Sequence, residues 1–294
     1  MPGFGSLAPV VLIVAATVPL WAQQPPVTPQ NNQESAHDLV RDVIYNELHD
    51  RERDSHWEYR SACLSPTQDV VREQVETASG PVFRLIEQDG KPLSATEQGR
   101  ENERLDDYIH DPVQIALVER SHDNDEAQVA AILQLVPDAF LFDYEEPPSE
   151  GIARIAFRPD PAFVPPNYQV RIVHALTGTM IVDLRLKRAI DMTGSVAERV
   201  DFGYGLLGHV EKGSSFHIHR QQVSATHWKA DVIETHVKGR VLIVKSLSKD
   251  QREIRSDFRP VPSGTTLAEA KEMLDQAADQ GVQARLVPAA PAEK

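Results

Sequence analysis

The order of apolar and polar positions in the first third of the chain predicts one helix followed by strands. Residues 35–50 carry Leu39, Val40, Val43 and Ile44 at the spacing of one helix face, and Ser35 can cap its start. Three segments of strand character follow, at residues 56–62, 69–77 and 81–88. The last of them runs into Asp89-Gly90, a residue pair typical of a tight turn.

Helical patterns occupy the next stretch of sequence. Ser94 and Glu97 form a capping box (S-A-T-E), which predicts a helix that continues to His110. A second helical pattern covers residues 125–135, and Pro137 is expected to end it because proline disfavours a helical residue before it.

From residue 151 onward the pattern changes to that of an antiparallel sheet. In residues 180–187, apolar side chains alternate with mainly charged ones, so one face is expected to be buried and the other solvated. Thr177-Gly178, Lys212-Gly213 and Lys238-Gly239 are the expected turns. The expected strands are 152–157, 168–176, 180–188, 200–204, 215–223, 228–237 and 241–247.

A last helix is predicted near the end of the chain. Thr266 and Glu269 (T-L-A-E) form a second capping box, and Gly281 has the place of a C-terminal glycine cap. Strands therefore flank a helical insertion at residues 94–136, which allows either two domains divided near Pro147-Pro148 or one sheet. One sheet is favoured, because three early strands alone make a weak domain. The predicted fold class is α+β, an antiparallel sheet with helices packed on one face.

The amino terminus has the pattern of an export signal. Residues 7–20 (LAPVVLIVAATVPL) are apolar, and fourteen residues are too few for a membrane span of about 20. We expect a signal peptide at residues 1–22, cleaved after Ala22, and a mature chain in the periplasm or secreted, without a membrane span. The alternatives are an uncleaved anchor and a buried N-terminal helix. A flexible linker at 23–33, one domain at 34–282 and a loose tail at 283–294 complete the expected organisation.

Charge and cysteine content narrow the range of partners. The formal net charge of −14 opposes binding to nucleic acid and to anionic membrane surfaces. Cys63 is the only cysteine, so the chain can form no internal disulfide and no zinc site that needs several cysteines. Cys63 itself is expected to be a structural strand residue rather than a reactive thiol, and no cofactor is predicted.

The sequence holds few groups with recognisable chemistry. His217 and His219 share one face of an expected strand and are the candidates for a metal site, which His209, His227, His236 or Glu211 would have to complete. The favoured interpretation is a solvated face without metal, because Ser215 and Gln221 lie on the same side.

Other short motifs point to structure rather than to catalysis. Asp201-Phe202-Gly203 spells a kinase motif but is expected to lead into a glycine-rich turn with Gly205 and Gly208, since the other kinase motifs are absent. Glu145-Glu146 is expected to be a solvated loop pair. No serine-hydrolase elbow, metalloprotease helix or phosphate loop occurs in the sequence, so no enzymatic activity is predicted and no catalytic residue is assigned.

The order of elements resembles one known superfamily. The segments FRLIEQDGKPLS, VDFGYGLLGHVEKGSSF and SDFRPVP are similar to those of exported bacterial proteins without an assigned activity. The leading helix, early strands, helical insertion and long meander resemble the LolA/LolB-like periplasmic lipoprotein carriers. That resemblance implies a curved half-barrel sheet whose helices cover the concave face and enclose acyl chains, but it assigns no ligand-binding residue here.

Three functions follow from these features. The first is a binding or carrier protein for a hydrophobic ligand or a lipoprotein. The second is a cell-envelope interaction or sensor module with a protein partner. The third is a metal-dependent hydrolase centred on His217 and His219.

Overall fold

The computed structural model describes residues 34–51, 56–202, 208–241 and 249–286, and the described residues from Ser35 onward belong to one compact unit. The helices described are α1 (Ala36–Arg51), α2 (Ala95–His110), α3 (Pro112–Ala139), α4 (Tyr168–His174) and α5 (Leu267–Leu286). The strands of the first half are β1 (Trp57–Ser65), β2 (Gln68–Val75), β3 (Val82–Gln88), β4 (Lys91–Pro92), β5 (Phe140–Tyr144), β6 (Ile152–Pro159) and β7 (Leu176–Asp183). The remaining strands are β8 (Arg188–Val196), β9 (Val200–Phe202), β10 (Gly208–Val210), β11 (Ser215–Gln222), β12 (Trp228–Val237), β13 (Gly239–Val241) and β14 (Lys249–Pro260).

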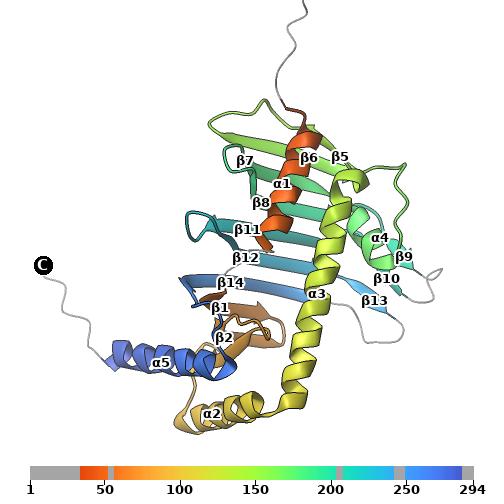
Figure 1. The fold of residues 1–294 in the computed structure, drawn as a ribbon. Coiled ribbons are helices and arrows are strands. Elements are labelled where there is room, and N and C mark those ends of the chain that lie inside the picture. The colour runs from red at the N-terminus through yellow and green to blue at the C-terminus, as the bar shows by residue number, and fades with distance from the viewer. Residues whose placement is uncertain (1–33, 52–55, 203–207, 242–248, 287–294) are drawn as a thin grey trace, which may run out of the picture. The chain divides into compact units, whose positions relative to one another are not determined.

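Eleven of these strands form one open antiparallel sheet, in the order β4-β3-β2-β1-β14-β12-β11-β8-β7-β6-β5. The last strand of the chain, β14, pairs with β1 on one side and with β12 on the other. It therefore joins the meander that precedes the helical segment to the meander that follows it (Figure 1). The α+β fold class is as predicted, and one sheet holds strands from both halves. A small second sheet has the order β13-β10-β9.

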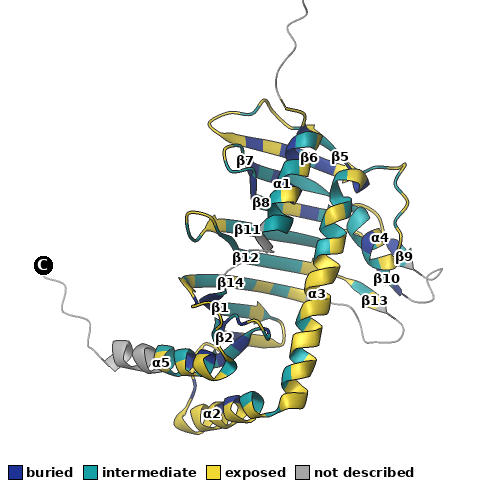
Figure 2. Cartoon of the chain, viewed as in Figure 1, coloured by how far each residue is buried: buried dark blue, intermediate teal, exposed yellow. Residues whose placement is uncertain are grey.

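Helix α1 packs on one end of the large sheet. Its apolar stripe is fully buried at Leu39 and Val40, which lie in one cluster with Ile155 of β6 and Met180 and Val182 of β7. We call the side of the sheet that carries Ile155 and Met180 the α1 face. Helix α3 contacts α1 and β5 near its C-terminus and α2 near its N-terminus, and most of its length is exposed (Figures 1 and 2).

Helices α2 and α5 pack at the opposite end, around β2 and β3. Leu105 of α2 and Leu274 of α5 are fully buried against Val75 and Val82. Side chains alternate along a strand, so Val82 points away from the side to which its neighbour Phe83 points. The register of the strands places Val82 on the side opposite to the α1 face. The helices thus lie on both sides of the sheet, whereas the sequence predicts them on one side. The difference arises because α5, the second capping-box helix, covers the separate apolar patch of Val75 and Val82.

Two segments predicted as strands fold differently. Residues 168–176 have apolar β-branched side chains, yet Tyr168–His174 forms α4 because the side chain of Asn167 accepts a hydrogen bond from the Val170 amide and caps the helix. The predicted strand 180–188 is broken at its centre. There Asp183 accepts a hydrogen bond from the Leu186 amide, and the chain turns through Lys187 at a φ of 50° into β8.

The expected turn at Thr177-Gly178 lies inside β7 instead. Four strands of the large sheet were not predicted: β4, β5, β8 and β14. Strand β14 (KDQREIRSDFRP) is charged along its length and shows no apolar alternation, so its pattern does not reveal a strand. Its position at the centre of the sheet is set by pairing with β1 and β12 on either side.

The starts of α1, α2 and α5 are as predicted, but the start of α3 and the ends of α3 and α5 are not. The capping boxes at Ser94–Glu97 and Thr266–Glu269 are both present. Helix α3 begins at Pro112, far before residue 125, because Asp111 caps it and proline suits the first helical turn. Pro137 lies within its final turn, and Gly281 lies inside α5 rather than at its end. The predicted signal peptide, linker, glycine-rich turn at 203–205, most of the strand at 241–247 and the end of the tail are outside the described residues.

Candidate functional site

A row of apolar side chains crosses the α1 face from strand to strand. Strand pairing aligns Ile155, Met180, Met192, Ile218 and Ile233, which come from β6, β7, β8, β11 and β12 in turn. Cross-strand partners point to the same side of a sheet, so these side chains form one continuous apolar strip. The first two are buried beneath α1, and the last three are half-buried. The strip therefore continues from under the helix onto the central strands.

Two glycines make room for aromatic rings on this face, beside the strip. A Cβ atom on Gly194 would lie 2.5 Å from an atom of the Phe216 ring, and one on Gly178 would lie 2.8 Å from the Phe157 ring. The two rings thus occupy the space that side chains on β7 and β8 would need. They pack near Phe140, which meets Phe157 edge to face at 5.6 Å between ring centroids. The aromatic cluster makes the glycines structural requirements of this part of the sheet.

Beyond Ile233 the α1 face becomes polar. Glu253 of β14 pairs with Ile233, accepts a hydrogen bond of 2.8 Å from the Ser61 hydroxyl and lies 2.7 Å from Nε of Arg255. The Arg255 guanidinium lies over the ring of Tyr59, 5.2 Å from its centroid. Burial raises the pKa of the Tyr59 hydroxyl above its ordinary value. The α1 face is thus apolar at one end and polar at the other.

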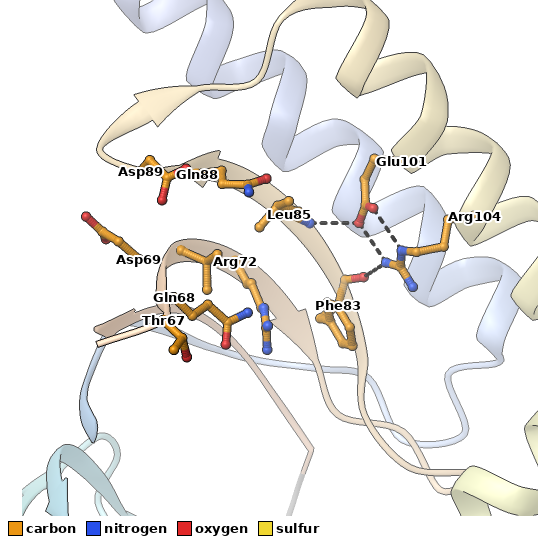
Figure 3. Close-up of a pocket in the computed structure, with 11 residues that line it drawn as sticks. Thr67, Gln68, Asp69, Arg72, Phe83, Leu85, Gln88, Asp89, Glu101 and Arg104 are labelled. Atoms are coloured by element: carbon orange, nitrogen blue, oxygen red, sulfur yellow. Dashed lines mark hydrogen bonds and ion pairs between the residues drawn. The ribbon is translucent and has the colours of Figure 1, made fainter. Parts of the chain in front are cut away.

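A groove of about 440 Å³ lies at this polar end, on β2, β3 and the nearby helix α2 (Figure 3). Arg72 of β2 and Arg104 of α2 each place a guanidinium over the Phe83 ring, at 4.8 and 4.6 Å from its centroid. Leu85 and Val70 add apolar wall, and the rim is polar. The full lining is Thr67, Gln68, Asp69, Val70, Arg72, Phe83, Leu85, Gln88, Asp89, Glu101 and Arg104.

Helix α2 covers the outer edge of β3 with an ion pair. Arg104 donates two hydrogen bonds to the Glu101 carboxylate, at 2.8 and 2.6 Å, and one to the Phe83 carbonyl at 2.7 Å. Glu101 in turn accepts a hydrogen bond of 2.8 Å from the Leu85 amide. The short β4 pairs with β3 only at Glu87 and Gln88, so the rest of β3 has an open edge. Open backbone groups invite pairing with another chain unless they are covered, and this ion pair covers them.

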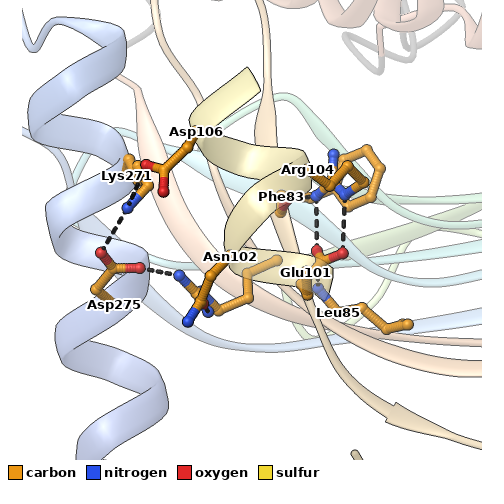
Figure 4. A network of polar contacts seen from close by, with 9 residues as sticks. Phe83, Leu85, Glu101, Asn102, Arg104, Asp106, Lys271 and Asp275 are labelled. Atoms are coloured by element: carbon orange, nitrogen blue, oxygen red, sulfur yellow. Dashed lines mark hydrogen bonds and ion pairs between the residues drawn. The ribbon is translucent and has the colours of Figure 1, made fainter. Parts of the chain in front are cut away.

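A second set of polar contacts fixes α2 and α5 to β3 (Figure 4). Arg84 donates a hydrogen bond of 2.6 Å to Asn102 of α2 and is paired with Asp275 of α5. Lys271 of α5 lies 3.0 Å from Asp275 and 3.1 Å from Asp106 of α2. The two helices are therefore held on β3 by charge as well as by the apolar contacts of Leu105 and Leu274.

The candidate metal residues lie on the face opposite to α1, engaged by carboxylates. His217 has Nε2 2.8 Å from Asp191 and Nδ1 3.3 Å from Glu234, and Arg252 lies 2.9 Å from the same Glu234. The hydrogen bond to Asp191 is the main reason that the pKa of His217 is raised above its ordinary value. These four side chains form a ladder of cross-strand charges on β8, β11, β12 and β14.

His219 does not complete a metal site with His217. Its Nδ1 lies 2.7 Å from Asp231, so each histidine has carboxylate partners of its own. Within the described ranges, no group of three or more histidine, cysteine or acidic side chains is placed to hold a metal ion. The residues suggested as a third ligand have other partners. His209 lies near Glu211, His227 is hydrogen-bonded to Ser224, and His236 pairs with Asp250.

The other residues that the sequence analysis considered for a chemical role lie among structural contacts. Cys63 lies partly buried on β1 in register with Glu253. Glu145 accepts a hydrogen bond of 2.8 Å from Thr179, and Glu145 and Glu146 both lie within 4 Å of Arg154. Asp201 pairs with Arg199 at the start of the small sheet.

Sequence patterns gave no indication of the groove. Arg72 and Phe83 lie eleven positions apart on adjacent strands, and Arg104 comes from a helix beyond them. The alternation of β2 and β3 shows which side chains share a face, but only the register between the strands and the docking of α2 bring these three together.

The comparisons leave the family open. No known family model and no curated protein sequence matches the chain. Over the residues that the structure describes, no helix combines the length and apolar character that crossing a membrane requires.

Proposed function

We propose that this chain is an exported binding or carrier protein that holds a hydrophobic ligand on the α1 face without altering it chemically. The ligand class is a lipid acyl chain, free or attached to a lipoprotein, as in the LolA/LolB-like carriers that the order of elements resembles. The periplasm is the proposed location, because the apolar segment at residues 7–20 has the length of a signal peptide.

The observation that carries the proposal is the apolar strip that leaves the cover of α1. Met192, Ile218 and Ile233 remain half-buried on the central strands of the sheet. Most large apolar side chains on interior strands of a sheet are buried, and a contiguous exposed apolar surface marks a binding site. Helix α3, which crosses the sheet, also leaves Val113 and Leu117 in contact with water, at 66% and 59% exposure.

The test is native mass spectrometry of the mature chain, from Gln23 onward, purified from the periplasm without detergent. A bound mass that extracts into organic solvent as lipid is expected. The matched variants are Ile218→Asp, which places a charge within the strip, and Ile254→Asp, which makes the same change on the opposite face of β14, where Ile254 is 41% exposed.

Ile218→Asp should lose the bound lipid, and Ile254→Asp should retain it. Circular dichroism of both variants checks that each is folded. A bare protein mass that takes up neither added fatty acid nor lipopeptide would contradict the proposal. Equal lipid content in the two variants would show that the ligand binds elsewhere.

Export is tested separately, by sequencing the amino terminus of the chain recovered from the periplasm. A new terminus at Gln23 is expected, because Ala22 is the small residue that precedes the predicted cut. Recovery of the intact chain from the cytoplasm would refute the proposed location, while leaving the ligand experiment on purified protein valid.

A further inference from the structure

Within the described part of the chain, no side chain neutralises the charge of Arg72, which lies in the groove. Among the described residues, no carboxylate forms an ion pair with its guanidinium, and its contact with the Phe83 ring is a cation–π interaction. Its Nε atom is buried and has no hydrogen-bond partner within the described part of the chain. A charge held partly out of water without an ionic partner costs free energy, so the guanidinium of Arg72 favours an anion in the groove.

The acidic residues around the groove do not fill this role. Glu101 is held by two hydrogen bonds from Arg104 and one from the Leu85 amide. Asp69 and Asp89 lie at the rim, where both are exposed to water. Figure 3 shows the Arg72 side chain within the groove, with Asp69 and Asp89 at its far end.

We propose that the groove binds a small organic carboxylate with a compact apolar body. The planar fork of an arginine matches a carboxylate through two parallel hydrogen bonds, which gives Arg72 a specific acceptor. Val70, Leu85 and Phe83 supply the apolar wall for the rest of the molecule. The volume of about 440 Å³ is that of a small-ligand site. This site is separate from the apolar strip and does not depend on the carrier function.

The experiment is a titration of the isotope-labelled mature chain with benzoate, followed by the backbone amide signals of β2 and β3. Benzyl alcohol and inorganic phosphate are the two reference probes, since one lacks the charge and the other lacks the apolar body. Benzoate is expected to shift the signals of residues 68–75 and 82–88 in a saturable manner, at concentrations at which neither reference probe does.

The variants are Arg72→Gln, Arg72→Lys and Arg252→Gln. Arg72→Gln should weaken benzoate binding about tenfold or more, because a charge-assisted hydrogen bond is lost. Arg72→Lys retains the charge without the fork and should fall between Arg72→Gln and the unaltered chain. Arg252→Gln removes an arginine from the opposite face of β14 and should leave binding unchanged.

Three results would overturn the proposal. They are equal binding of benzyl alcohol, tighter binding of inorganic phosphate, and unchanged benzoate binding in Arg72→Gln. The amide spectrum of each variant without ligand verifies the fold, and Arg72→Lys keeps the test valid if the loss of charge disturbs β2.

Discussion

Truncation of Leu105 tests whether helix α2 is packed on the sheet as the structure shows. Leu105 is fully buried and contacts the cluster formed by Val75, Val82, Val261 and Leu274. Replacing a buried leucine by alanine removes its apolar contacts and leaves a cavity, which costs about 2–5 kcal/mol. We expect Leu105→Ala to lower the free energy of unfolding by about 3 kcal/mol. For a chain of this size, that corresponds to a fall in Tm of roughly 6–12 °C.

The matched control is Leu117→Ala, the same substitution on the neighbouring helix α3. Leu117 is 59% exposed, so its truncation should change the stability by less than about 0.5 kcal/mol. Thermal unfolding of the two variants and the unaltered chain, followed by circular dichroism in the far ultraviolet, gives the comparison. Urea unfolding at 25 °C checks that the ranking does not depend on the method.

Equal shifts for the two variants would refute the packing of α2. So would a fall in Tm below about 2 °C for Leu105→Ala. That result would also remove the support for the groove, because α2 carries Glu101 and Arg104 to the edge of β3. Loss of benzoate binding in a folded Leu105→Ala variant would instead show that α2 shapes the groove.

Three further substitutions test other contacts. Ser94→Ala removes the hydroxyl of the first capping box and should cost about 1 kcal/mol in urea unfolding. The carboxylate partners of His217 raise its pKa, so the stability that they provide is full below about pH 6.5 and is lost as the pH rises through the raised value. His217→Gln should therefore lower Tm more at about pH 5.5 than at about pH 8.5. An equal effect at both pH values would refute this. Gly194→Ala should cost about 1–3 kcal/mol because its new methyl group meets the Phe216 ring, whereas Gly99→Ala, in an open position of α2, should not destabilise the fold.

Local signals in the sequence determined where helices α2 and α5 begin. The hydroxyl of Ser94 and the carboxylate of Glu97 satisfy backbone groups within one turn, and the pair at Thr266 and Glu269 does the same. Such contacts need no distant partner, so they are readable in the order of residues. Apolar spacing likewise identified helix α1 (Ala36–Arg51) and strands β2, β3 and β6.

Where the strands lie was decided by the tertiary structure. Strand β14 has a charged sequence that favours no strand by itself, and Glu253 acquires its place through Ser61 on one neighbour and Ile233 on the other. Sequence alternation indicates two faces for a strand, but it gives neither the neighbours nor the register. Tyr168–His174 shows the reverse, a β-prone segment that a side-chain cap turns into a helix.

The candidate site depends on these long-range pairings. The sequence by itself determined the α+β class, the antiparallel pattern, the helix caps and the unusual apolar amino terminus. Only the folded chain aligned five apolar residues from five strands into one strip, and only the docking of α2 brought Arg104 to the Phe83 ring beside Arg72. The physical reason is range: caps and periodicities act within a few residues, whereas a binding surface is made by side chains that meet across strands.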